Sequence, residues 1–227
     1  MRTLTLLAAA SFAAMAVPAS ATITFGNQTI GQGEEVLLPV GQTGSTILGE
    51  TNQSHTSVTF TSGTCTGCST QTLDTPANGQ ARIEATNTVL ENLTIALTDL
   101  SDPMAGFGYI EFNIDETGNI GNAMSVTIDA LDQFGNPFSE TADVGNGSNF
   151  FSALATDGEV IRSISFNTGD TTGFTDIRQI RIQPAVGTQP GSVPEPATWA
   201  MMLFGFGAAG VAMRRSRRKT ALFTQAA

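Results

Sequence analysis

The chain has 227 residues, enough for one domain of ordinary size with terminal extensions. Its 10 basic and 20 acidic residues give a net charge of −10, but six of the basic residues lie in the two terminal segments. Residues 22–193 hold four arginines, no lysine and 19 acidic residues, a net charge of −15. Phosphate backbones would repel so acidic a body, which excludes a nucleic-acid-binding protein. One histidine and two cysteines exclude most metal-enzyme and disulfide-scaffold classes.

The N-terminus has the layout of a secretory signal peptide. Arg2 gives a charged start, an apolar run covers residues 4–17, and Ala19 and Ala21 form a small-x-small cleavage site. The apolar run is shorter than a membrane span. We predict a signal peptide over residues 1–21, exported through the Sec translocon and cut after Ala21 by signal peptidase. A retained N-terminal anchor is the alternative.

The body of the chain has the pattern of an all-β domain. Short alternating apolar runs recur between Gly, Asn, Asp and Pro, and no long segment has a helical period. The runs predict strands over residues 23–30, 35–40, 57–61, 81–85, 93–97, 108–114, 124–130, 150–154, 160–166 and 176–182. Ten short strands with frequent turn signals predict an antiparallel β-sandwich.

Four segments of the body give local detail. In residues 125–131 the apolar side chains point one way and Ser, Thr and Asp the other, and residues 132–137 predict a hairpin loop. In residues 161–166 the apolar face is expected to switch near Arg162. The irregular apolar spacing within residues 177–182 predicts a β-bulge.

The two cysteines, Cys65 and Cys68, form a C-x-x-C sequence flanked by Thr, Ser and Gly. In an oxidising compartment this sequence predicts a disulfide that closes a small loop. Such a small ring removes little entropy from the unfolded chain, so it would order a loop tip more than stabilise the fold. A redox pair and a metal site are the alternatives.

Oxygen-bearing side chains gather in four segments of the body: residues 115–119, 129–136, 143–146 and 170–176. Ca²⁺ takes six to eight oxygen ligands. However, Asp and Asn are also ordinary turn residues, and none of the segments has the spacing of an EF-hand. A structural calcium ion and solvated turns both stay open, no metal ligand is assigned, and no other cofactor is predicted.

The sequence offers no defined catalytic set. His55, the one histidine, lies in a polar stretch that predicts an exposed loop, and the chain has no G-x-S-x-G nucleophile elbow. A carboxylate pair for glycoside hydrolysis drawn from so many acids would be arbitrary. Tyr109 and Trp199 are the only residues of their types, so a sugar-stacking aromatic face is not predicted. We therefore expect a non-enzymatic protein, with a carbohydrate-binding module and a secreted hydrolase as alternatives.

The C-terminal segment has the layout of a membrane-directed tail. Pro194, Glu195 and Pro196 precede an uncharged apolar run over residues 197–213, with Trp199 near its start. As a helix this run would span about 25 Å, slightly less than a hydrocarbon core of about 30 Å. A basic cluster follows it: Arg214, Arg215, Arg217, Arg218 and Lys219. By the positive-inside rule this cluster stays in the cytoplasm and the body lies outside.

This tail resembles the PEP-CTERM sorting tail of Gram-negative bacteria, in its PEP-x-x-W-A variant. The resemblance covers residues 193–219. It implies an exosortase, a membrane protease that recognises Pro194, Glu195 and Pro196 and removes the tail. It also implies a protein at the cell surface or in the extracellular matrix, associated with exopolysaccharide or biofilm. A plain single-pass anchor is the alternative.

The body carries a second resemblance. Residues 149–151, 157–161 and 173–182 are similar to the end of jelly-roll domains on bacterial surface proteins, which implies a jelly-roll-like sandwich and no particular activity. The chain is then predicted to consist of a signal peptide (1–21), a β-sandwich ectodomain (22–184), a linker (185–193), a sorting tail (194–219) with a transmembrane helix (197–213), and a cytoplasmic end (220–227). The expected route passes through a transient inner-membrane intermediate to the cell surface or the medium.

Overall fold

A computed structural model describes residues 22–26, 33–64, 70–76, 79–86, 89–116, 124–168, 173–187, 202–207, 210 and 214. The chain divides into two compact units, residues 1–187 and 188–227. The described elements of the first unit are all β-strands, and the described residues of the second are helical. The prediction of an all-β body is confirmed.

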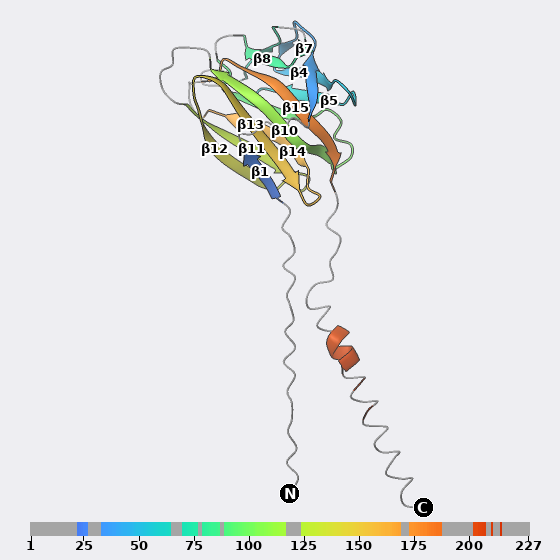
Figure 1. Ribbon diagram of the computed structural model, residues 1–227. Coiled ribbons are helices and arrows are strands. Elements are labelled where there is room, and N and C mark those ends of the chain that lie inside the picture. Colours follow the sequence, from blue (N-terminus) through green and yellow to red (C-terminus); the bar gives the residue numbers. More distant parts are fainter. Residues whose placement is uncertain are drawn as a thin grey trace, which may run out of the picture. The chain divides into compact units, whose positions relative to one another are not determined.

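The first layer of the body consists of long strands around β10. Its order is β1 (Thr22–Gly26), β13 (Gly147–Thr156), β10 (Ala105–Glu116) and β15 (Asp176–Val186). The short strand β8 (Arg82–Ala85) pairs with β15 on its far side. Each of these pairs is antiparallel, as Figure 1 shows for β10, β13 and β15.

The second layer has the order β4 (Thr46–Thr51), β5 (Ser57–Thr61), β9 (Asn92–Leu97), β14 (Ile161–Asn167), β11 (Met124–Asp132) and β12 (Pro137–Val144). Strand β2 (Glu34–Leu38) pairs with β15 and with β4, and thereby joins the two layers. Three two-residue strands complete the set: β3 (Thr43–Gly44), β6 (Leu73–Asp74) and β7 (Gly79–Gln80).

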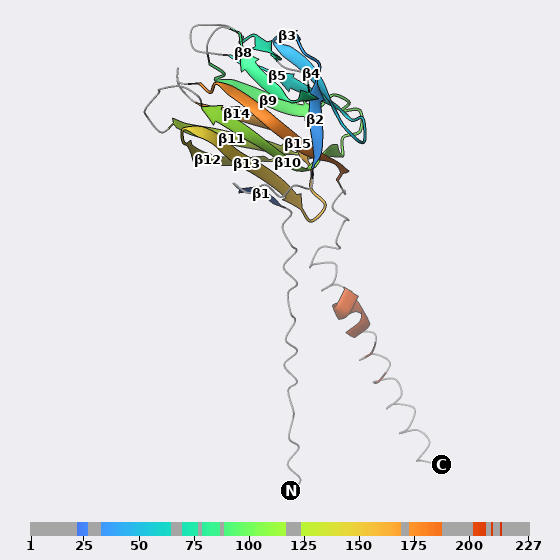
Figure 2. The ribbon, with the colours of Figure 1, turned by 45° about the horizontal axis from the view of Figure 1, so that its top comes forward.

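The core lies between the layers and is built from alternate residues of the strands. In β5 and β9 the inward side chains are apolar and fully or nearly buried, while the outward ones are mainly Thr. Phe112 of β10 contacts Phe166 of β14 across the sandwich, with ring centroids 5.3 Å apart. Two further rings extend this contact. The Phe151 centroid lies 6.1 Å from that of Phe112, and the Phe174 centroid lies 6.2 Å from that of Phe166. Figure 2 shows the strands of both layers from a second side.

The bulge predicted within residues 177–182 is present, whereas the expected switch of the apolar face near Arg162 is wrong. The β11–β14 register shifts at Arg162, and this extra residue keeps Ile161, Ile164 and Phe166 buried in the same core. The β10–β15 register shifts at Gln179, whose φ is 53°. Because this bulge adds a residue to β15, Ile177, Ile180 and Ile182 all reach the core despite their uneven spacing.

The hairpin loop predicted over residues 132–137 joins β11 to β12. Asp132 is buried there, and its carboxylate accepts hydrogen bonds from the backbone N–H groups of Phe134 and Asn136, both at 2.8 Å. The prediction that Leu131 shares the apolar face of β11 is wrong, since Leu131 is 41% exposed. The period of two places the even-numbered residues of β11 inward, and Leu131 is odd-numbered.

Two substantial strands, β4 and β12, were not among the predicted ones. The inward positions of β4 include Gly49, and a Cβ there would lie 2.8 Å from Leu38 and 2.9 Å from Val36, so glycine permits the close packing. In β12 only Val144 is fully buried, because this strand lies at an edge and pairs with β11 alone among the described strands. Neither strand therefore shows a continuous apolar alternation in its sequence.

The end of the body lies slightly beyond the predicted start of the linker at residue 185. Ala185 and Val186 belong to β15 and pair with Gly106 and Ala105. Backbone pairing extends the strand here, although these residues follow Pro184, which has no N–H to donate. The jelly-roll topology stays a prediction.

The predicted signal helix, residues 1–21, lies outside the described residues. Within the predicted transmembrane segment 197–213, residues 202–207 and 210 are helical. Among the described residues, no helix has the length and apolar character needed to cross a membrane.

The contact across the sandwich predicts a large effect of Phe166→Ala. Phe166 is fully buried between Phe112 and Phe174, so truncation leaves a cavity and should lower the free energy of unfolding by about 3–5 kcal/mol. Urea unfolding followed by circular dichroism measures this change. Phe134→Ala is the control, because Phe134 is 44% exposed in the hairpin loop and should cost less than about 1 kcal/mol. Equal effects of the two variants would contradict the packing described.

Candidate functional site

Most of the predicted site residues lie outside the described residues. This holds for the cleavage residues Ala19 and Ala21, for Cys65 and Cys68, for the sorting residues Pro194, Glu195, Pro196 and Trp199, and for Arg215, Arg217, Arg218 and Lys219. Arg214 is described, and it is helical and exposed. The candidate sites with described geometry are therefore in the body.

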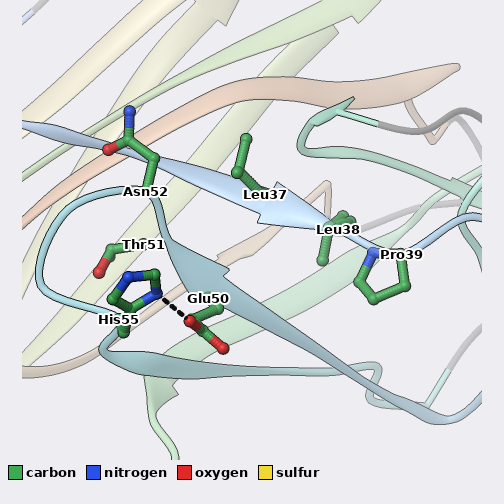
Figure 3. A pocket seen from close by; sticks show the side chains of 7 residues that line it. All are labelled: Leu37, Leu38, Pro39, Glu50, Thr51, Asn52 and His55. Carbon is green, nitrogen blue, oxygen red and sulfur yellow. Dashed lines mark hydrogen bonds and ion pairs between the residues drawn. The ribbon is translucent and has the colours of Figure 1, made fainter.

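A pocket opens beside the β2–β4 pair (Figure 3). Its volume is about 300 Å³. Its lining comes from the end of β2, the end of β4 and the turn after β4: Leu37, Leu38, Pro39, Glu50, Thr51, Asn52 and His55. The wall on the β2 side is apolar, and the polar groups gather on the β4 side.

The turn after β4 is held in place by hydrogen bonds to neighbouring strands. The backbone N–H of Ser54 donates to the Glu34 carboxylate at 2.7 Å, and this bond lowers the pKa of Glu34. The Thr51 hydroxyl bonds the Ser54 hydroxyl at 2.7 Å and accepts from the Thr56 N–H at 2.9 Å. These bonds fix the position of His55, whose φ of 54° lies in the left-handed region.

His55 contacts the carboxylate of Glu50 through its Nδ1 atom (Figure 3). The two side chains are 75% and 53% exposed, in agreement with the polar loop expected for His55. Within the described part of the chain, the histidine ring has no hydrogen-bond partner other than Glu50. The sequence did not indicate this pair, because five residues separate its members and their meeting depends on the turn.

A second polar cluster, the arginine–carboxylate cluster, covers the outer face of the first layer. It contains Arg82, Glu84, Asp115, Asp176 and Arg178. Asp176 is completely buried and accepts from Arg178 Nε at 2.8 Å and from Arg82 Nε at 3.0 Å. Arg178 also pairs with Asp115, and Arg82 with Glu84. Buried carboxylates require such partners, since their desolvation would otherwise be very costly.

The same face carries a further ion pair, separate from this cluster, between β10 and β15. Glu111 is buried, accepts from the Tyr109 hydroxyl and lies 3.5 Å from Arg181 Nε. Asn113, between Glu111 and Asp115 on β10, donates to Gln179 at 3.1 Å, while its buried Oδ1 atom has no partner among the described residues. Three of the four arginines of the body thus neutralise buried carboxylates of one sheet face.

The fourth arginine of the body, Arg162, binds backbone instead of carboxylates. Its guanidinium donates to the carbonyl groups of Leu100, Asp102 and Ala105 at 2.8, 2.6 and 3.0 Å. It thereby fixes the turn that precedes β10. All four arginines of the body have structural partners.

Three buried carboxylates in the acidic segments considered for calcium have other partners. The Asp132 carboxylate accepts hydrogen bonds from backbone N–H groups of the hairpin loop, and Asp115 and Asp176 form ion pairs with arginines. Within the described ranges, no group of three or more His, Cys, Asp or Glu side chains is arranged to hold a metal ion.

Comparison with protein families gives one match. The family model for the PEP-CTERM protein-sorting motif matches residues 192–218. The chain carries a PEP-CTERM sorting motif. The resemblance of the C-terminal tail to the PEP-CTERM sorting tail is therefore confirmed, while the roles of Pro194, Glu195, Pro196 and Trp199 stay predictions. No curated protein matches the chain.

The PEP-CTERM motif indicates a secreted protein that is sorted by an exosortase-type membrane protease. It also supports export to the cell surface or the extracellular space. The match covers the tail and gives no activity to the β-sandwich body, which must be argued from its own residues.

The arginine–carboxylate cluster predicts a particular pH dependence of stability. Burial raises the pKa of Asp176 above its ordinary value, and Arg82 only partly opposes this effect. The folded chain therefore holds a proton at Asp176 more tightly than the unfolded chain does. The stability contributed by this group is fully present at low pH and is lost as the pH rises through the folded-state pKa.

Asp176→Asn removes this titration. The free energy of unfolding of the wild type, relative to that of the variant, should therefore fall as the pH rises above the ordinary pKa of an aspartate. Urea unfolding at several pH values measures the difference. Asp143→Asn, on the exposed part of β12, controls for the loss of one charge. A wild-type advantage that rises with pH would show that the arginines outweigh burial at Asp176.

Proposed function

We propose that this chain is an exported, non-enzymatic protein of the cell surface or extracellular matrix, cut at both ends. The observation that carries the proposal is the PEP-CTERM match at residues 192–218. Signal peptidase would produce the mature start at Thr22. The exosortase would remove the tail near Pro194, Glu195 and Pro196, where two prolines favour an extended chain that a protease can bind.

The composition of the tail supports a temporary role for the apolar segment. The run over residues 197–213 is short for a permanent span and is rich in Gly and Ala. The basic residues after it would hold its end in the cytoplasm while the protease acts. The released body, with its net charge of −15, would be highly soluble.

Association with exopolysaccharide or biofilm is the second part of the proposal. The second layer presents hydroxyl groups from neighbouring strands, including Thr59 with Thr98 at 2.7 Å and Thr127 with Thr141 at 3.3 Å. Hydroxyl groups both donate and accept hydrogen bonds, which suits contact with hydrated polysaccharide. A non-enzymatic role agrees with the sequence, which has no G-x-S-x-G nucleophile elbow and no histidine other than His55.

The proposal predicts the two ends of the mature protein. Intact mass and terminal sequencing of protein from the producer's envelope and medium should give a chain from Thr22 to a residue near Pro194–Pro196. Alanine substitution of Pro194, Glu195 and Pro196 together should leave the tail attached and move the protein to the membrane fraction.

Pro190→Ala is the matched control, because it changes a proline just outside the matched motif. It should leave processing unchanged. A wild-type chain that keeps residue 227 and stays in the inner membrane would contradict the proposal and indicate a permanent anchor.

A further inference from the structure

The pocket beside β2 and β4 lies at the surface of the body, and the sorting function of the tail gives it no role. Its polar wall carries Glu50 and His55, both well exposed, and its apolar wall carries Leu37, which is 39% exposed. Leu37 and Glu50 are register partners on β2 and β4, so their side chains lie side by side on the same face. An exposed leucine next to an exposed carboxylate, in a concave site, has the character of a binding site.

We propose that this pocket binds an amino-sugar unit of a polysaccharide through its free ammonium group. The ammonium group would pair with the Glu50 carboxylate, and the C–H face of the ring would lie against Leu37 and Pro39. This inference rests on the proposed association with exopolysaccharide and names the kind of sugar that the body would recognise.

The charge around the pocket favours a cationic ligand. Glu34 and Glu35 lie on β2, next to the wall of the pocket, and no arginine or lysine lines it. The four arginines of the body are held by carboxylates or backbone carbonyls elsewhere. A uronic acid or a sulfated sugar would meet only negative charge and the His55 ring, whereas an ammonium group would be attracted.

The residues that line the pocket also indicate that charge, rather than stacking on an aromatic ring, selects the ligand. None of the seven lining residues is Phe, Tyr or Trp, so the pocket lacks the large aromatic faces on which sugar rings usually stack. A volume of about 300 Å³ lies at the lower end for small-molecule sites and suits one unit of a polymer. The pocket is open to solvent, which leaves room for the neighbouring sugars of a chain.

The His55 contact leaves Glu50 able to bind a second cation. The imidazole Nδ1 contacts Oε1, and a carboxylate has a second oxygen and further lone pairs for an ammonium group. The exposed Asn52 side chain lies at the same wall and can bond a sugar hydroxyl. The His55 ring occupies part of the Glu50 carboxylate that the ammonium group would contact, so its removal should not weaken binding.

The test uses the full chain, purified in detergent, and glucosamine oligosaccharides with free amino groups. The titration is carried out at about pH 5.5, where the free amino groups of the sugar are charged. Titration calorimetry should detect binding to the free-amine oligosaccharide and none to its N-acetylated counterpart or to alginate. Glu50→Gln should weaken binding at least about tenfold, and added salt at about 0.5 M should weaken the wild-type binding.

Matched variants separate the pocket from general charge effects. Glu140→Gln removes one exposed carboxylate from β12 and should bind as the wild type does. His55→Ala should bind at least as tightly as the wild type, and Leu37→Ser should bind more weakly. Equal binding by Glu50→Gln and the wild type, or equal binding of acetylated and free-amine sugars, would overturn the assignment. Tighter Glu50-dependent binding of oligolysine would overturn it in favour of a basic peptide.

Fractionation of the producer's matrix separates this inference from the proposed function. Wild-type protein that stays with the matrix, together with Glu50→Gln protein that leaves it, supports both. If both proteins stay with the matrix, the pocket assignment fails and the proposed function stands. If the wild type itself is absent from the matrix, the proposed association with exopolysaccharide fails, whatever the calorimetry shows.

Discussion

Strand β15 lies against β10 from Val186 beside Ala105 to Asp176 beside Asp115, and much of the body depends on this pairing. Its inner face supplies Ile177, Ile180 and Ile182 to the core. Its outer face brings arginines to the buried carboxylates of β10. The bulge at Gln179 makes both possible, because a regular strand could not turn these isoleucines inward and the arginines outward at this spacing.

The sequence predicted the elements whose information is local. Each of the ten expected strands lies within or overlaps an observed one, and the bulge in β15 followed from its apolar spacing. The hairpin loop at Asp132 followed from its turn residues. Strand β4 escaped prediction because Gly49 faces inward for a reason that lies on β2, where Val36 and Leu38 pack. Information of that kind is absent from the strand's own residues.

The candidate sites also differ in how far the sequence alone could predict them. The sorting tail is a linear signal, so its tripeptide, apolar run and basic end could be identified directly and agree with the family match. The pocket at Glu50 depends on how the turn after β4 folds back, and the arginine–carboxylate cluster is formed by residues distant in sequence, such as Arg82 and Asp176. Acidic residues are so common in this chain that composition could not indicate which of them would meet an arginine and which would face solvent.

The position of β15 has a mechanical consequence. It is the last described strand of the body, and it lies between β10 on one side and β2 and β8 on the other. Tension applied through the C-terminus would act along the axis of β15 and load its hydrogen bonds together, in shear. An edge strand such as β12 would instead peel away one bond at a time. A body pulled by its C-terminal end would thus transmit the force into the centre of its first layer.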